Sequence, residues 1–130
     1  MPRVLVVDDT PSIRLLIKTN LELAGFTVEE AVDGVACLEQ LAADSVLPDA
    51  ITIDVMMPRM DGISTVTSLR NDPRTANIAV VMVTTQNHPA DIQRATEAGV
   101  DCFLVKPFDP DELVDELHRA IEVRTARDNS

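Results

Sequence analysis

The sequence has no tryptophan, no tyrosine and only three phenylalanines. Proteins that bind single strands of nucleic acid stack the bases on aromatic side chains, so this class is disfavoured. Basic residues are also few, since 11 Lys and Arg stand against 22 Asp and Glu and the formal net charge is −11. Duplex DNA and anionic membranes both attract Lys and Arg. We therefore expect neither direct nucleic-acid binding nor membrane association.

Cysteines and long apolar segments are scarce as well. Cys37 and Cys102 are too few and too isolated for a disulfide framework or a zinc site. No apolar run approaches the roughly 20 residues that span a bilayer. The chain begins MPRVLVVDD, which has no long apolar segment of the kind found in signal peptides. These absences together predict a cytoplasmic protein.

The length and composition predict one globular domain. A chain of 130 residues is too short for two ordinary domains, and one of this size buries roughly two-thirds of its unfolded surface. With 45% hydrophobic and 25% charged residues, the composition is that of a folded protein rather than a disordered one.

Short apolar runs alternate with helical patterns along the chain. The runs at 4–7, 50–53, 78–83 and 102–105 show no alternation, which is typical of strands buried on both faces, whereas 26–32 alternates like an edge strand. Apolar residues recur at helical spacing over 13–21, 35–42, 63–69, 89–98 and 113–121. This order predicts an α/β fold with a parallel sheet, right-handed crossovers and helices on both faces.

Polar side chains follow four of the predicted strands. Asp8 and Asp9 end the first, Asp54 the third, Thr84 the fourth and Lys106 the fifth. Each has an ordinary explanation taken singly, such as a helix cap, a turn, a strand residue or a surface lysine. In open parallel sheets, however, ligands bind outside the carboxyl ends of the strands. Four strand ends that supply complementary groups therefore indicate a site.

The residue types at these ends suit phosphate chemistry. Three carboxylates at close range repel one another, and a divalent cation such as Mg²⁺, which takes carboxylate oxygens, waters and a substrate phosphate, relieves that repulsion. Lys106 can act as a point charge for a phosphoryl oxygen, and Thr84 can donate a hydrogen bond to one. Asp54 is then a candidate nucleophile that forms an acyl phosphate.

Four motifs occur together in this order: VLVVDD at 4–9, DVMMPRMDG at 54–62, VMVTT at 81–85 and LVKPF at 104–108. With them the chain, from residue 3 to about 123, resembles the receiver domain of bacterial two-component response regulators, of the stand-alone, CheY-like type. The resemblance implies a doubly wound, flavodoxin-like (βα)5 fold in three layers, with a five-stranded parallel sheet in the order 2-1-3-4-5. We expect residues 1–123 to form this domain and residues 124–130 to be a polar C-terminal tail without an output domain.

The resemblance also implies roles for the residues at the strand ends. Asp54 is the expected phosphoryl acceptor, and Lys106 is the expected partner of the phosphoryl group. Mg²⁺, with Mn²⁺ as a substitute, is expected on Asp8, Asp9, Asp54 and the backbone carbonyl of Met56.

A conformational switch is implied by two further positions. Thr84 is expected to move toward the phosphoryl group, and Phe103 to turn inward after it. This change would alter a face formed by the predicted helix 89–98, strand 102–105 and helix 113–121. The resemblance further implies that Met56 and Gln86 tune dephosphorylation, and that the Lys106–Pro107 bond is of a kind that is cis in this family.

The resemblance therefore predicts a signalling protein rather than an enzyme. A histidine kinase or a histidine phosphotransfer protein is the expected phosphoryl donor, with slow self-catalysed phosphorylation from small phosphodonors, slow self-dephosphorylation and an effector protein downstream. The protein is expected to be a monomer or a phosphorylation-dependent dimer.

Three alternatives stay open. The chain could be the receiver part of a longer regulator. It could be a Mg²⁺-dependent phosphatase of the haloacid dehalogenase type, although that motif needs an aspartate where Met56 stands. It could also bind a nucleotide or flavin, although the segment DDTPS after the first strand lacks the glycines of a phosphate loop.

Overall fold

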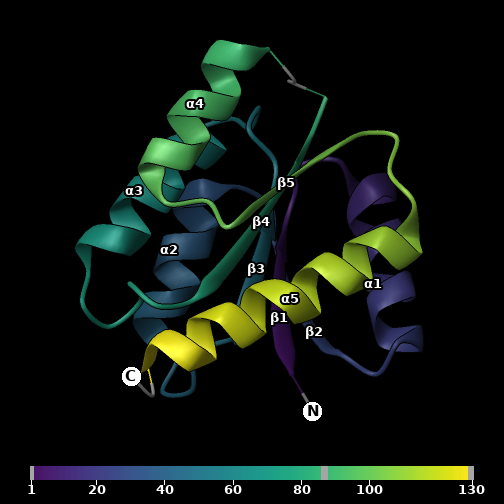
Figure 1. Cartoon of the computed structure of the whole chain (residues 1–130), viewed down its shortest axis with the longest axis horizontal. Helices are drawn as coiled ribbons and strands as arrows, with labels where there is room; N and C mark the ends of the chain where they lie inside the picture. Colours follow the sequence, from purple (N-terminus) through teal and green to yellow (C-terminus); the bar gives the residue numbers. More distant parts are fainter. Residues whose placement is uncertain (1, 86–87, 129–130) are drawn as a thin grey trace.

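A computed structural model describes residues 2–85 and 88–128, in which strands and helices alternate along the chain (Figure 1). The elements are β1 (Arg3–Val7), α1 (Pro11–Leu23), β2 (Thr27–Ala31), α2 (Gly34–Ala43), β3 (Ala50–Ile53), α3 (Gly62–Asn71), β4 (Ala79–Thr84), α4 (Pro89–Ala98), β5 (Cys102–Val105) and α5 (Pro110–Asp128). Every predicted element is present, and most predicted boundaries lie within three residues of the observed ones.

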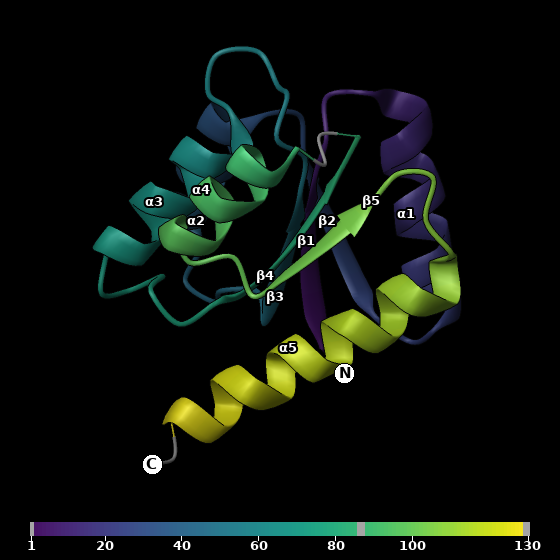
Figure 2. The same cartoon turned by 45° about the horizontal axis from the view of Figure 1, so that its top comes forward.

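The strands form one parallel sheet in the order β2-β1-β3-β4-β5, which confirms the predicted doubly wound, flavodoxin-like fold. Figure 2 shows α2, α3 and α4 on one face of the sheet and α1 and α5 on the other. The strand order reverses between β1 and β3. In folds of this type the crevice for a ligand lies at that point, outside the carboxyl ends of the strands.

Two apolar layers, one on each face of the sheet, make up the core. Along β4, Val80 and Met82 belong to the layer under α2, α3 and α4, whereas Val81 and Val83 belong to the layer under α1 and α5. All six residues of β4 and all four of β3 are buried. These strands therefore show no alternation in the sequence because both of their faces lie against helices.

Local residues explain where the helices begin. Asp33 and Asp61 cap α2 and α3, with side-chain oxygens that accept hydrogen bonds from the amides of Ala36 (2.8 Å) and Ser64 (2.7 Å). Prolines open α1, α4 and α5. Among the helices of residues 2–85 and 88–128, none combines the length and the apolar character needed to cross a membrane.

The expectation that residues 124–130 form a tail is wrong for residues 124–128, because α5 continues to Asp128. The Nη2 atom of Arg124 lies 2.7 Å from Oδ1 of Asp101. The backbone carbonyl of Arg124 accepts a hydrogen bond from the side-chain amide of Asn77 (3.1 Å). Both partners belong to loops at the amino-terminal edge of the sheet. These contacts hold the polar last turns of α5 in place. Residues 129–130 lie outside the described residues.

Candidate functional site

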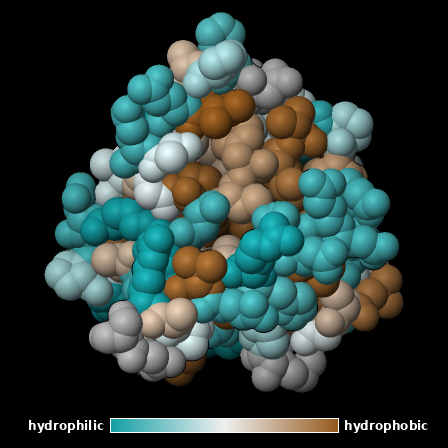
Figure 3. Space-filling model, viewed as in Figure 1, coloured by the Kyte–Doolittle hydropathy of each residue, from teal (hydrophilic) through white to brown (hydrophobic). Residues whose placement is uncertain are grey.

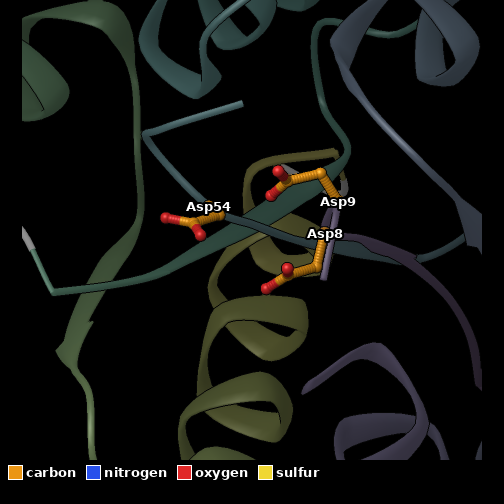
Figure 4. Close-up of side chains that lie close together, drawn as sticks. All are labelled: Asp8, Asp9 and Asp54. Atoms are coloured by element: carbon orange, nitrogen blue, oxygen red, sulfur yellow. The ribbon is translucent and has the colours of Figure 1, made fainter. Parts of the chain in front are cut away.

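Three aspartates meet where β1 and β3 end side by side. Asp8 and Asp9 follow β1, and Asp54 follows β3. One carboxylate oxygen from each lies within 4.8 Å of the others, and Figure 4 shows the three side chains extending from these adjoining strand ends. The predicted cluster of carboxylates is thus present in the structure.

The ammonium group of Lys106, which follows β5, bridges two of these carboxylates. Its Nζ atom donates to Oδ2 of Asp8 (3.0 Å) and to Oδ2 of Asp54 (3.1 Å). Burial opposes the charge of Lys106, but the hydrogen bond to Asp8 and the negative charges of Asp54 and Asp8 outweigh it and raise the pKa of the ammonium above 10.5. The Lys106–Pro107 peptide bond is cis. Lys106 is therefore a fixed positive charge within the site.

The three carboxylates differ in their surroundings. Asp8 is buried, and its Oδ1 atom accepts a hydrogen bond from the Thr10 amide (2.9 Å). Asp54 is partly buried, and its Oδ1 atom accepts a longer bond from the Met56 amide (3.4 Å). Asp9 is exposed, and its carboxylate takes part in no hydrogen bond or ion pair within residues 2–85 and 88–128.

This charge distribution fits a divalent cation. Three carboxylates and one ammonium leave two formal negative charges in the site. Carboxylate oxygens are the ligands that Mg²⁺ prefers, and an exposed Asp9 leaves room for the waters that this ion retains. The residues present therefore suit the expected metal.

The two residues expected to act as a switch, Thr84 and Phe103, lie on neighbouring strands. Thr84 ends β4 and is buried, and Phe103 is partly buried in β5 opposite Met82. Side chains alternate along a strand, so Thr84 faces the same side as Met82, in the layer that also contains Phe103. The hydroxyl and the ring thus share the side of the sheet covered by α4. Gln86 lies outside the described residues.

The loop between β3 and α3 contains contacts that the sequence analysis did not foresee. A Cβ atom at Gly62 would lie 2.1 Å from the carbonyl oxygen of Asp54, so only glycine fits there. Arg59 pairs with Asp33 at the start of α2, with Nε 2.7 Å from Oδ2. The sequence signals a helix start here, because Asp61 is a favourable N-cap residue, but the close approach of Gly62 to Asp54 depends on the folded chain.

Sequence comparison identifies the family. Residues 4–118 match the family model described as "Response regulator receiver domain". The chain is 42% identical over 127 residues to the DNA-binding dual master transcriptional regulator RpaA of Synechocystis sp. strain ATCC 27184 / PCC 6803 / Kazusa, and the match covers 98% of this chain and 52% of RpaA. The chain thus spans about half the length of this curated relative. Because RpaA is a DNA-binding regulator, the expectation that nucleic acid is no partner is not supported.

Solved structures agree with this assignment. The chemotaxis protein CheY4 of Vibrio cholerae has a TM-score of 0.85 at 36% identity, over 92% of this chain and 98% of that one. The receiver domain of sensor histidine kinase PA1611 from Pseudomonas aeruginosa PAO1 has a TM-score of 0.84 at 26% identity, over 93% and 98%, and contains a magnesium ion coordinated in its active-site cleft. The chain therefore belongs to the response regulator receiver domains, which act in two-component signalling.

Proposed function

We propose that the chain receives a phosphoryl group on Asp54 from the phosphohistidine of a histidine kinase or a histidine phosphotransfer protein. The observation that carries this proposal is the position of Lys106, whose ammonium lies 3.0 Å from Asp8 and 3.1 Å from Asp54 at the carboxyl ends of three strands. A nucleophile beside a fixed cation and further carboxylates is an arrangement that suits phosphoryl transfer.

The chain's own residues perform the transfer. A carboxylate oxygen of Asp54 attacks phosphorus, the bond from phosphorus to the imidazole nitrogen breaks, and the imidazole departs with that electron pair. Lys106 donates hydrogen bonds to the phosphoryl oxygens as their charge increases. The same chemistry accounts for slow labelling by small phosphodonors and for slow loss of the phosphoryl group to water.

Asp8, Asp9, Asp54 and the carbonyl of Met56 are the residues that would hold Mg²⁺, and Mn²⁺ is a suitable substitute because it also takes oxygen ligands. The bound ion supplies charge neutralisation for the phosphoryl oxygens. Two observations support this role: the two uncompensated negative charges of the site and the magnesium ion in the related PA1611 domain.

The signal would leave the site through Thr84 and Phe103. The hydroxyl of Thr84 moves toward the new phosphoryl group, and Phe103 repacks in the same layer. The face formed by α4, β5 and α5 then changes its affinity for an effector protein or for a second copy. Figure 3 shows hydrophobic side chains gathered beside α4 over the region of β5. Ile92 of α4 and Val105 of β5 are exposed hydrophobic residues of these two elements. A tenfold change in affinity needs about 1.4 kcal/mol.

We further propose that the unit that performs this function includes the whole of α5, which extends beyond the boundary expected at residue 123. We place the reaction in the cytoplasm, because both Cys37 and Cys102 are free thiols and disulfides persist in oxidising compartments.

The substitution Asp54→Asn tests the assignment. Acetyl phosphate with Mg²⁺ should label the unmodified chain, as measured by intact mass spectrometry, and should not label the variant, because an amide oxygen is a poor nucleophile. Asp49→Asn is the matched control, since Asp49 precedes β3 as Asp54 follows it, and it should be labelled normally. Labelling that persists in Asp54→Asn would refute the assignment. Sustained turnover of phosphate esters would instead favour the phosphatase alternative.

A further inference from the structure

The loop between β3 and α3 contains a strained turn centred on Arg59. The φ angle of Arg59 is 68°, and the Met60 amide donates to the carbonyl of Pro58 (2.8 Å), which closes a three-residue γ-turn. Positive φ is uncommon for a side chain other than glycine, and a γ-turn of this hand is rare and strained. Such a conformation persists only where the surrounding structure holds it.

A bidentate ion pair with Asp33 holds this turn. Arg59 donates from Nε to Oδ2 (2.7 Å) and from Nη2 to Oδ1 (2.9 Å) of a carboxylate that is itself buried. The hydrogen bond from Arg59 and the one from the Ala36 amide lower the pKa of Asp33 below 3.8. Because Asp33 also caps α2, its position is set by the helix. Two parallel bonds to such a carboxylate fix the guanidinium in both distance and angle.

The same loop also touches the backbone beside the site. Its Met60 carbonyl lies so close to α2 that a Cβ atom at Gly34 would be 2.9 Å away. At its far end, the Gly62 amide donates to the carbonyl of Val55 (2.9 Å). Between these contacts, the Met56 amide points at Oδ1 of Asp54. A shift of the Arg59 turn is therefore transmitted to Val55 and Met56, which directly follow Asp54.

We propose that Arg59 is a positioning residue, whose ion pair with Asp33 keeps the backbone of Val55 and Met56 in the place that cation binding at Asp54 requires. Arg59 acts through the loop, and its guanidinium is bound to Asp33 rather than to the three carboxylates. Breaking the pair then weakens Mg²⁺ binding although every carboxylate of the site is still present. This inference rests on the proposed function, because it concerns the metal site of the same reaction.

Mg²⁺ titrations of the full chain, followed by the backbone amide signals in NMR spectra, measure this effect. Arg59→Gln removes the charge, and Asp33→Asn removes the charge of the partner while it keeps an oxygen for the Ala36 amide. Each substitution should raise the dissociation constant for Mg²⁺ on the order of tenfold, the usual effect of removing a group that orients a metal site. The double variant should lose no more than either single one, since both remove the same contact.

Arg94→Gln is the matched control. Arg94 pairs with Asp91 on α4, and its side chain is 59% exposed, close to the 53% exposure of the Arg59 side chain. The substitution therefore removes the same charge from a similar environment. It should leave the dissociation constant unchanged. Thermal unfolding without Mg²⁺ separates positioning from stability, because a merely structural role would lower the unfolding temperature and leave Mg²⁺ affinity as it was.

Three results would overturn the positioning role alone, provided that acetyl phosphate still labels Asp54 in the unmodified chain. They are unchanged Mg²⁺ affinity in Arg59→Gln, an equal loss in Arg94→Gln, and losses that add in the double variant. An unmodified chain that neither binds Mg²⁺ nor becomes labelled would refute the proposed function, and this inference with it.

Discussion

Lys106 shows how one side chain changes the properties of its neighbours. Without Lys106, Asp8 and Asp54 would repel each other. Its ammonium prevents this by donating a hydrogen bond to one carboxylate oxygen of each. The pKa of the Lys106 ammonium is raised above 10.5 in the folded chain. Its contribution to stability is therefore complete below pH 10.5 and is lost only as the pH rises through the pKa of the folded state. The ammonium therefore stays charged throughout the neutral range, as the proposed phosphoryl transfer requires.

Thr52 is the opposite case, a polar group without a partner. Its hydroxyl is the buried side-chain polar atom that lacks a hydrogen bond in the described part of the chain. It lies in β3 between Val6 and Val81, which belong to the apolar layer under α1 and α5. We predict that Thr52→Val stabilises the protein by about 1 kcal/mol, because a buried unpaired hydroxyl costs on this order. Urea unfolding measures the change.

Thr75→Val is the control for that experiment. Thr75 is also buried, but its hydroxyl donates to the carbonyl of Leu69 (2.7 Å), so the same substitution breaks a hydrogen bond. It should destabilise the protein by about 1 kcal/mol. Equal effects of the two substitutions would show that the Thr52 hydroxyl has a partner after all.

At the scale of elements, the connections that follow the strands contain the candidate site. The rigid sheet places the ends of β1, β3 and β5 together, and the residues just beyond those ends supply all the charged groups of the site. The connection after β3 needs glycine at Gly62, because α3 begins directly against the carbonyl of Asp54. The residue type at this helix start is therefore set by the close approach of the Asp54 carbonyl.

Arg124 ties the last two turns of α5 to the loop that precedes β5. The Arg124 side chain is 13% exposed and binds Asp101, which also accepts hydrogen bonds from Arg70 (3.2 Å) and the Val80 amide (2.8 Å). We predict that Arg124→Ala costs about 1–2 kcal/mol of stability, less than a buried charge left wholly unpaired, because Arg70 still neutralises Asp101. Hydrogen exchange should show faster exchange of the amides in residues 124–128.

Arg119→Ala provides the comparison in the same helix. Its side chain is 66% exposed and pairs with Glu116 one turn away, an arrangement worth no more than about 0.5 kcal/mol. If both substitutions change exchange equally, the contact with Asp101 does not hold the end of α5.

At the scale of the whole molecule, acidity links stability to the metal. The formal net charge is −11, and two uncompensated negative charges are concentrated in the site. Self-repulsion disfavours the compact state, so a cation that binds only the folded chain stabilises it. We predict that Mg²⁺ at ten times its dissociation constant adds about 1.4 kcal/mol to the free energy of unfolding. Thermal unfolding monitored by circular dichroism should show a rise of a few degrees.

A chelator should reverse this stabilisation, and Asp9→Asn should diminish it, because Asp9 is exposed and free to bind the ion. NaCl at matched ionic strength separates binding from general screening. An equal rise in NaCl would mean that the cations act only by screening.

Much of the fold and of the candidate site was predictable from local patterns. The runs 50–53 and 102–105 coincide with β3 and β5, and the alternation of helices and strands implied a parallel sheet. Asp8, Asp9, Asp54 and Lys106 could be found because each directly follows a strand. Their convergence follows from the geometry of parallel sheets, which brings all carboxyl ends to one edge.

Only the tertiary structure decided which of these groups touch and where the polar segments pack. Lys106 bridges Asp8 and Asp54 across 98 and 52 residues of sequence, and the pair of Arg59 and Asp33 joins positions 26 residues apart. The end of α5 was misjudged because its partner Asp101 lies 23 residues away. Periodicity reports which face of an element is buried, whereas the partner of a charged side chain depends on how distant elements fold together. The sequence by itself therefore determined the elements of the fold and predicted the candidate residues of the site, and the folded chain determined their contacts.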